Sequence, residues 1–292
     1  MPAGDILLLG GTGLVGSTLR RAWADEVVAP GHAELDVLDE TALAAWLGRN
    51  RANVVVNAVG WADVDGAERE RGDTGGRVHA LNVDFPRRLA GLCQQLDKHL
   101  IHFSTDYVFD GTNAERPYVE TDPTHALCWY AETKLRGEQA LLSSSASVCV
   151  ARIEMPFTSS DHPKRDLART VVARLRAGRS IEGVTDQRIT PVFLDDVAQA
   201  ILRLVETRHT GVIHVAAAGW TTPYDFARSI GRRLGLPEEL VQKVTFERFA
   251  ATRPARRPQH SWLDVSRFEG MFGTGILKSV EAQLDAWAGA RQ

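Results

Sequence analysis

The sequence predicts an α/β fold in which a doubly wound parallel sheet is joined by a smaller C-terminal lobe. Short apolar runs alternate with helical patterns through the first half of the chain. The runs are apolar almost throughout, as expected for parallel strands that helices cover on both faces. A glycine-rich turn joins the first run to the first helical pattern. Such a turn is typical of parallel sheets that bind a ligand at the carboxyl ends of their strands.

The predicted elements alternate in a regular order up to residue 155. Five apolar runs are predicted to be strands, at residues 5–10, 26–30, 53–60, 98–105 and 147–152. Apolar residues spaced three to four apart predict helices between them, at residues 14–24, 40–50, 75–96 and 129–142. Because each strand is followed by a helix, neighbouring strands are expected to run parallel.

The pattern is less regular beyond residue 155. Residues 155–166 show no period and predict a loop, which precedes a basic amphipathic helix at 167–178. A helix at 195–206, a strand at 211–216 and a helix at 221–235 follow, while Pro254 and Pro258 keep their segment extended. We therefore expect a large domain and a smaller lobe that exchange segments of the chain, with the large domain at 1–155 and 191–216 and the lobe at 156–190 and 217–292.

Composition excludes several classes of protein. Hydrophobic residues make up 44% and charged residues 24%, and the net charge of −3 gives no electrostatic reason to expect a nucleic acid. The first apolar stretch follows Asp5 and is broken by glycines, so neither a signal peptide nor a membrane span is predicted. Three cysteines without C-x-x-C spacing (Cys93, Cys128 and Cys149) suit a reducing compartment and argue against a metal site. A cytoplasmic protein with no membrane partner is expected.

The glycine-rich turn predicts a dinucleotide site. Gly10, Gly13 and Gly16 form G-x-x-G-x-x-G directly after the first predicted strand. Glycines at these places let backbone N–H groups approach a diphosphate at the helix N-terminus. The predicted cofactor contacts here are Gly10, Thr12, Gly13, Leu14 and Val15, together with Ala58, Val59 and Gly60 after the 53–60 strand. A tight strand exit is an equally good explanation for Ala58 and Gly60.

The second strand bears on which cofactor binds. It ends with neither an acidic side chain nor an arginine, and His32 is the nearest group able to meet a phosphate. Asp36 and Val37 are predicted to hold the adenine. The missing acidic residue favours NADP(H), and NAD(H) remains possible.

Polar residues at the end of the 98–105 strand predict the part of the site where the reaction takes place. Ser104, Thr105 and Asp106 lie at the edge where parallel strands meet ligands, and Tyr130 and Lys134 share one face of the next helix. An isolated Tyr-x-x-x-Lys is most often a simple stacking pair. Together with Thr105, however, it offers a hydroxyl for a carbonyl oxygen, a phenol to protonate that oxygen and an ammonium to tune the phenol. Lowering the phenol pKa by ~3 requires ~4 kcal/mol, and the Lys134 ammonium beside a positively charged nicotinamide acts in that direction.

At this point the chain resembles a known family. The segments GGTGLVG, STDYVFDGT, PYVETDP, YAETKLRGE, TPVFLDDVAQAI and RPQHSWLDVSRFE are similar, in order and spacing, to the dTDP-4-dehydrorhamnose reductase family of extended short-chain dehydrogenase/reductases. The resemblance covers nearly the whole chain. It implies a Rossmann fold and the reduction, by a nicotinamide cofactor, of the C4 carbonyl of a dTDP-linked 4-keto-6-deoxy sugar.

The resemblance also implies roles for single residues. Tyr130 matches the catalytic acid, Lys134 the residue that binds the nicotinamide ribose and tunes Tyr130, and Thr105 the hydroxyl on the carbonyl oxygen. Asn82 matches an asparagine of the family, and a helix-to-loop hydrogen bond explains it equally well. The implied substrate contacts are Trp61, Val64, Asp65, Thr105, Asp106 and Tyr107, with Ala62 a further candidate.

One departure from the family concerns the sugar end of the site. Met155 stands where the family usually has an aromatic platform, and we expect it to contact the substrate. A different nucleotide-linked deoxysugar is therefore an alternative substrate. Two further alternatives do not depend on Met155: a regulatory binding role without catalysis, and assembly into a homodimer. Four arginines near the C-terminal end, Arg248, Arg253, Arg256 and Arg257, are explained equally well as solvated surface or as anion-binding residues.

Overall fold

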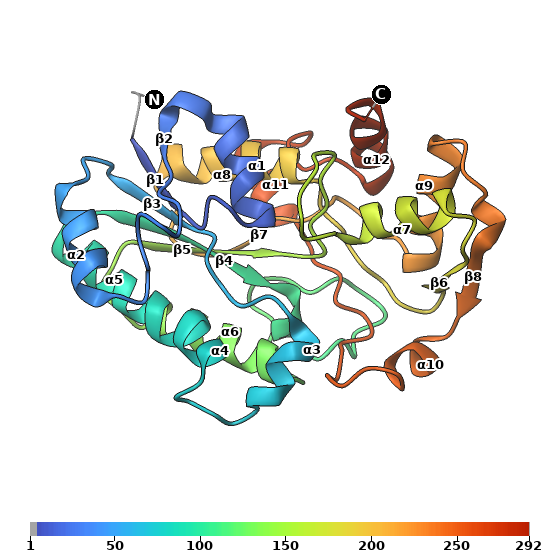
Figure 1. The fold of residues 1–292 in the computed structure, drawn as a ribbon, viewed down its shortest axis with the longest axis horizontal. Coiled ribbons are helices and arrows are strands. Elements are labelled where there is room, and N and C mark those ends of the chain that lie inside the picture. The colour runs from blue at the N-terminus through green and yellow to red at the C-terminus, as the bar shows by residue number, and fades with distance from the viewer. Residues whose placement is uncertain (1–4, 292) are drawn as a thin grey trace.

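The computed structural model describes residues 5–291 and is built around a parallel sheet of six strands (Figure 1). The strand order is β2-β1-β3-β4-β5-β7. Four of these strands are buried along their whole length, as expected for the centre of such a sheet. The bounds are β1 (Ile6–Leu9), β2 (Val27–Val28), β3 (Val54–Asn57), β4 (His99–Thr105), β5 (Val148–Ile153) and β7 (Gly211–His214). The predicted α/β fold is confirmed.

Helices cover both faces of this sheet (Figure 1). Successive side chains of a strand point to opposite faces, so Leu8 and Val56 join one core, and Leu7 and Val55 join the other. Both faces are therefore apolar, which explains why the strands are near-continuous apolar runs in the sequence. One face carries α1 (Leu14–Trp23), α8 (Leu194–Thr207) and α11 (Ser266–Phe272), and the other carries α2 (Glu40–Arg49), α5 (Phe85–Gln95) and α6 (Trp129–Leu142).

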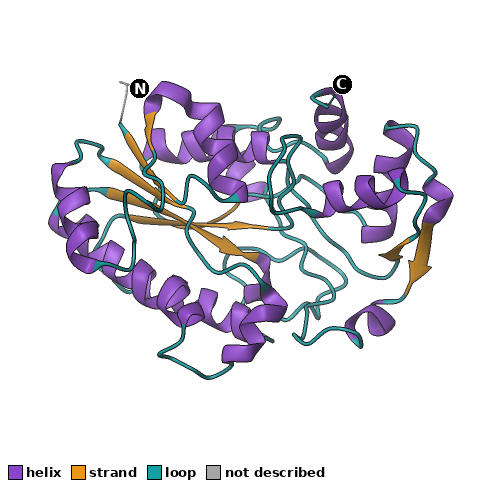
Figure 2. Cartoon of the chain, in the orientation of Figure 1, coloured by secondary structure: helices purple, strands orange, loops and turns teal. Residues whose placement is uncertain are grey.

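A smaller group of elements lies beside the large sheet (Figure 2). Its core contains Phe157, Phe226 and Trp287. The ring centroid of Phe157 lies 5.3 Å from that of Phe226 and 6.3 Å from that of Trp287. It comprises a two-stranded parallel sheet of β6 (Ile181–Val184) and β8 (Val241–Val244) with α7 (Leu167–Arg176), α9 (Pro223–Arg233), α10 (Phe246–Ala250) and α12 (Val280–Gly289). The domain division stays a prediction, but four residues placed in the lobe pack in the core of the large sheet instead: Leu263, Val265, Phe268 and Leu277.

The helix predicted at 75–96 contains a π-helical turn. It consists of α4 (Arg77–His79), η3 (Ala80–Asp84) and α5. The Asn82 side chain lies in this turn, where Oδ1 accepts from the Trp61 N–H at 2.8 Å and Nδ2 donates to Thr133 Oγ1 at 3.0 Å. Asn82 thus joins the loop after β3 to α6. This is the helix-to-loop hydrogen bond that was one of the two explanations for Asn82 from the sequence.

Some elements are shorter than predicted or were not predicted. β2 stops at Val28, two residues before Pro30, which has no N–H to donate to a neighbouring strand. Five elements were not predicted: β6, β8, α10, α11 and α12. The first four are short, whereas α12 has ten residues and buried apolar side chains at helical spacing (Val280, Leu284 and Trp287) that could have indicated it. The remaining short elements are η1 (Ala24–Glu26), α3 (Val64–Ala67), η2 (Glu68–Glu70), η4 (Asp106–Val108) and η5 (Glu238–Leu240).

Three further findings concern the chain as a whole. No helix within residues 5–291 combines the length and apolar character needed to cross a membrane. The cysteines Cys93, Cys128 and Cys149 are free and buried. In the same part of the chain, no group of three or more histidine, cysteine, aspartate or glutamate side chains is placed to hold a metal ion.

Candidate active site

The glycine-rich turn forms a cradle between β1 and α1. Gly10 has a φ of +85°, and a Cβ there would lie 2.8 Å from the carbonyl carbon of Ala58. A Cβ on Gly16 would lie 2.1 Å from the Gly10 carbonyl oxygen. These two positions therefore need glycine, and α1 can begin close to the ends of β1 and β3 with its first N–H groups available.

A cavity of about 290 Å³ opens at this turn. Of the predicted cofactor residues, Gly10, Thr12, Gly13, Asp36, Val37, Ala58, Val59 and Gly60 line it. Pro30, Leu38, Arg77 and Leu81 also line it and were not predicted. Asp36 is held in place because its Oδ1 accepts from the Leu38 N–H at 3.0 Å. Nothing in the sequence indicated that Arg77 would line this cavity, because it lies at the start of a helix far from the glycine motif.

Replacing Gly16 with alanine is expected to abolish cofactor binding. The new methyl group would overlap the Gly10 carbonyl, so the turn must move at a cost of ~1–3 kcal/mol in unfolding free energy. Titration of NADPH by fluorescence and denaturation in urea measure the two effects. Gly48→Ala in α2 is the matched control, because its Cβ would meet no atom within 4 Å. NADPH binding by Gly16→Ala equal to that of the wild type would contradict the assigned role of the turn.

A second cavity, of about 470 Å³, adjoins the first one at Gly13, Ala58, Val59 and Gly60. It brings together Thr105, Tyr130 and Lys134, the three residues predicted for catalysis. Other predicted residues that line it are Leu14, Val15, Trp61, Ala62, Val64, Asp106, Tyr107 and Met155. The predicted cofactor and substrate contacts thus lie along one continuous cleft, with Asp65 as the exception.

Thr105 and Tyr130 meet where β4 ends and α6 begins. The Thr105 hydroxyl accepts from the Tyr107 N–H at 3.2 Å and donates to Asp106 Oδ1 at 2.9 Å. Burial raises the pKa of the Tyr130 phenol, and a hydrogen bond with Thr105 offsets part of that rise. In the chain by itself, burial and the charges of Asp106 and Cys128 all raise the pKa of Tyr130. The predicted lowering depends on Lys134 together with a bound nicotinamide, and it stays a prediction.

Lys134 is held by groups of β4. Its Nζ donates to the Phe103 carbonyl at 2.7 Å and lies 3.2 Å from His102 Nε2. His102 Nδ1 in turn lies 2.9 Å from the Asn57 amide. Burial lowers the pKa of Lys134 to about 8. His102 and Asn57 were not predicted, although polar side chains within apolar strands are a sequence signal that could have indicated them.

Asp65 lines neither of the two cavities. Both of its carboxylate oxygens accept from Arg257, at 2.9 and 3.0 Å, and Oδ1 also accepts from the Ala255 N–H at 3.2 Å. The side-chain hydrogen bond with Arg257 lowers the pKa of Asp65. The substrate contact stays a prediction, and in the structure the carboxylate joins α3 to the 251–264 segment. The same pair shows that Arg257 is neither a free surface cation nor an open anion site.

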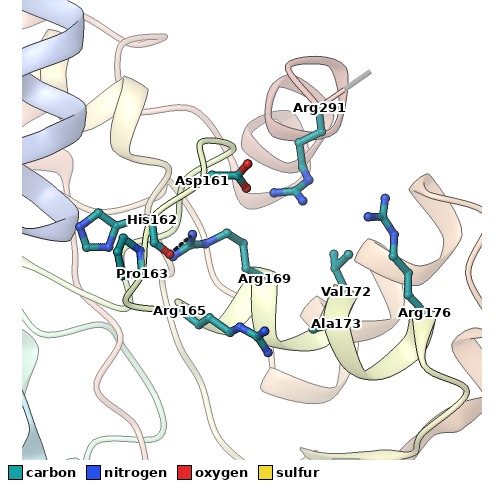
Figure 3. Close-up of a pocket in the computed structure, with 9 residues that line it drawn as sticks. All are labelled: Asp161, His162, Pro163, Arg165, Arg169, Val172, Ala173, Arg176 and Arg291. Atoms are coloured by element: carbon teal, nitrogen blue, oxygen red, sulfur yellow. Dashed lines mark hydrogen bonds between the residues drawn. The ribbon is translucent and has the colours of Figure 1, made fainter.

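A separate groove of about 550 Å³ lies between α7 and the end of α12 (Figure 3). Arg165, Arg169, Arg176 and Arg291 line it, and Figure 3 shows Arg169 reaching the His162 carbonyl, at 2.8 Å. None of the four arginines singled out from the sequence lines this groove. Because His162 and Arg165 line both spaces, the 161–165 loop is the wall between the groove and the catalytic cavity.

Known proteins resemble the chain along almost its full length. The family model described as RmlD substrate binding domain matches residues 4–287. A probable dTDP-4,6-dihydroxy-2-methyloxan-3-one 4-ketoreductase of Streptomyces antibioticus is 36% identical and covers 97% of this chain and 92% of its own. A dTDP-4-dehydrorhamnose reductase of Mycolicibacterium smegmatis is 34% identical and covers 97% and 85%.

A solved structure with the same name as one of these relatives shares the fold. The crystal structure of a dTDP-4-dehydrorhamnose reductase of Clostridium acetobutylicum superposes with a TM-score of 0.87 at 25% identity, covering 97% of this chain and 98% of that one. The motifs, the fold and these matches together place the protein in the dTDP-4-dehydrorhamnose reductase family, as the sequence predicted.

Proposed function

We propose that the protein is an NAD(P)H-dependent reductase acting on the C4 carbonyl of a dTDP-linked 4-keto-6-deoxy sugar, as dTDP-4-dehydrorhamnose reductase does. The convergence of Thr105, Tyr130 and Lys134 on a cavity that adjoins the glycine cradle carries this proposal. The relatives named as 4-ketoreductases support the substrate class.

The residues fit a dinucleotide. The cradle has no room for a Cβ at Gly10 or Gly16, so backbone N–H groups at the start of α1 are free to meet a diphosphate. Gly10, Thr12 and Gly13 would hold the diphosphate, Asp36 and Val37 the adenine, and Lys134 the nicotinamide ribose. When bound, the reduced nicotinamide supplies the hydride. We propose NADP(H) as the preferred cofactor, since His32 and Arg77 line the adenosine end and the Asp36 carboxylate is held on Leu38.

The side chains divide the proton chemistry among them. The phenol of Tyr130 stays protonated because burial raises its pKa, so it is available to protonate the sugar oxygen. The Thr105 hydroxyl orients that oxygen. Lys134 is fixed by Phe103 and His102 below Gly60, where it supports the phenol and the cofactor.

A panel assay tests the function. Loss of NADPH and NADH absorbance is followed with dTDP-4-dehydro-β-L-rhamnose, and with the same sugar carried on UDP as control. We expect turnover with the dTDP sugar and a higher kcat/KM with NADPH. Tight cofactor binding with no turnover of any keto sugar would contradict a reductase and favour a binding role.

Met155 supports a second candidate substrate, a dTDP-linked ketosugar other than the rhamnose precursor. It lines the cavity with a φ of +39°, an uncommon conformation for a side chain of this size. It also replaces the expected aromatic platform. The Streptomyces relative is named for a different keto sugar, which agrees with this candidate. A kcat/KM that is higher for such a sugar than for dTDP-4-dehydro-β-L-rhamnose would favour it.

Replacing Arg257 with lysine is expected to raise the KM for the sugar nucleotide up to ~10-fold while NADPH binding is unchanged. A single ammonium group cannot make both bonds to Asp65, so the 251–264 segment would be held less firmly beside Tyr107 and the substrate side of the cavity. Steady-state kinetics at saturating NADPH measure the effect. Arg253→Lys, a nearby residue that stacks on Phe249, is the matched control. An equal KM for the two variants would contradict the role of the pair.

A further inference from the structure

Two carboxyl groups lie buried next to the catalytic hydroxyl. Asp106 is 2% exposed and Glu154 is fully buried. Asp106 directly follows Thr105, and Glu154 directly precedes Met155. The sequence singled out Asp106 and Met155 but not Glu154, so the structure adds a second acid to this end of the site.

Hydroxyl groups link the two carboxyls to the reacting residues. Ser261 Oγ donates to Glu154 Oε1 at 2.7 Å, and the same hydroxyl lowers the pKa of Asp106, so it lies next to both carboxyl groups. The other oxygen of Glu154 accepts from the N–H of Thr190 at 2.6 Å and from the hydroxyl of the same residue. Asp106 Oδ1 contacts the Thr105 hydroxyl at 2.9 Å, and Oδ2 has no partner within residues 5–291. Glu154, Ser261, Asp106, Thr105 and Tyr130 thus form one chain of contacts.

Within residues 5–291, neither Asp106 nor Glu154 makes an ion pair with a cation. Arg257 faces Tyr107 but is bound to Asp65, and Lys134 donates to the Phe103 carbonyl. Arg152, on the strand that precedes Glu154, is bound to Glu138. The other titratable groups that line the cavity beside Asp106 are the phenols of Tyr107 and Tyr130 and, on the opposite loop, His162, Lys164, Arg165 and Asp166.

Two neighbouring carboxyl groups that are buried without an ion-pair partner resist being ionised together. Burial raises the pKa of Asp106 to about 7. Burial, together with the charge of Asp106, raises the pKa of Glu154 to about 8. At least one proton therefore stays with the pair near neutral pH.

We propose that Asp106 and Glu154 share one proton and that Asp106 returns it, through the Thr105 hydroxyl, to Tyr130 after Tyr130 has protonated the substrate. The inference rests on the proposed function. Glu154 is in this account a positioning residue, because it acts only by keeping the proton on Asp106.

The proton transfers balance. The Tyr130 O–H bond breaks as an O–H bond forms on the sugar oxygen, while the hydride brings the electron pair to carbon. The phenolate then takes the proton of Thr105. The Thr105 hydroxyl donates to Asp106 Oδ1 at 2.9 Å in the resting site, and once its own proton has left, Thr105 Oγ takes the proton of Asp106 across the same contact. The pair is then left without a proton, the doubly ionised state that burial disfavours, and it takes up one proton from solvent. Transfer is downhill, because burial holds the pKa of the phenol above that of the acid.

Glu154→Gln tests the shared proton and the relay together. Its amide oxygen can accept from Thr190, and its NH₂ can donate to Ser261, whose hydroxyl is then free to donate to Asp106. The remaining acid should ionise at lower pH. In the wild type, the rate of a single turnover should begin to fall at a certain pH, and in Glu154→Gln we expect that pH to be lower by at least ~1. At pH 8 the rate of the variant should therefore be up to ~10-fold below that of the wild type, and at pH 6 the two rates should be equal.

A second readout needs no activity. Between the ordinary carboxyl pKa of ~4 and a folded value near 8, the folded state binds protons that the unfolded chain has lost, so wild-type stability should fall as pH rises. Urea denaturation from pH 5 to pH 9 should show a shallower fall in Glu154→Gln. Glu132→Gln on α6, which removes an exposed carboxylate, should keep the wild-type slope and rate profile. Asp106→Asn should flatten the slope and lower the rate at every pH.

Each outcome decides between the claims. An unchanged unfolding slope in both Glu154→Gln and Asp106→Asn would show that the pair holds no shared proton. A changed slope with an unmoved pH profile of the turnover rate would overturn the relay while leaving the reductase intact. Absence of wild-type turnover would instead reject the proposed function, and the relay with it, whatever the unfolding slopes show.

Discussion

Tyr130→Phe is expected to lower kcat by about 10²–10⁴-fold while leaving the Kd for NADPH unchanged. The substitution removes only the phenol oxygen, which is the proton donor in this account, and leaves the ring in its contact with Tyr107, at 5.8 Å between centroids. Loss of NADPH absorbance with the keto sugar measures kcat, and titration calorimetry measures cofactor binding.

The matched control for this prediction is Tyr224→Phe. Tyr224 lies in α9 of the smaller lobe, beside Arg228 and Lys243, and should tolerate loss of its hydroxyl without any change in kcat. If Tyr130→Phe turned over as fast as Tyr224→Phe, the donor would have to be another group, and Asp106 would be the first candidate because it lines the same cavity.

Arg152→Met is expected to lower the free energy of unfolding by ~3–5 kcal/mol. Arg152 in β5 makes two hydrogen bonds to Glu138 in α6, at 3.0 and 2.7 Å, and both side chains are less than 5% exposed. Removing the arginine leaves a carboxylate buried without a partner. The pair joins the helix that carries Tyr130 and Lys134 to the sheet, so activity should be lost at a lower temperature as well. Urea denaturation measures the change.

Two comparisons make this prediction specific. Arg203→Met breaks an exposed pair with Glu206 on α8 and should cost less than ~1 kcal/mol. The double variant Arg152→Met, Glu138→Met removes both charges and should recover much of the lost stability. An equal cost for Arg152→Met and Arg203→Met would show that the buried pair does not hold α6 on the sheet.

The sequence predicted those features of the site whose residues lie close together along the chain. The glycine spacing at 10, 13 and 16 predicted the cradle, because the need for glycine arises from contacts between neighbouring turns. The spacing of four between Tyr130 and Lys134 placed both on one helix face, and the position of Thr105 at a strand end predicted that it would meet them. The three residues line one cavity in the folded chain.

The sequence was insufficient where distant segments meet. Asp65 looked like a substrate contact because it lies near Trp61, but its partner Arg257 is 192 residues away. Glu154 was overlooked because its partners Thr190 and Ser261 come from segments without periodic structure. Burial, which raises the pKa of the Tyr130 phenol in the chain by itself, was likewise not predictable, because its extent depends on the packing of the whole site.

Hydride transfer to a sugar carbonyl is the reaction proposed for this cavity. The most direct test is to incubate the protein with NADPH deuterated at nicotinamide C4 and dTDP-4-dehydro-β-L-rhamnose, and to locate the label by mass spectrometry and NMR. We expect one deuterium at C4 of the product sugar with the wild type and almost none with Tyr130→Phe. Cofactor binding without transfer of deuterium to any dTDP-linked keto sugar would contradict this proposal.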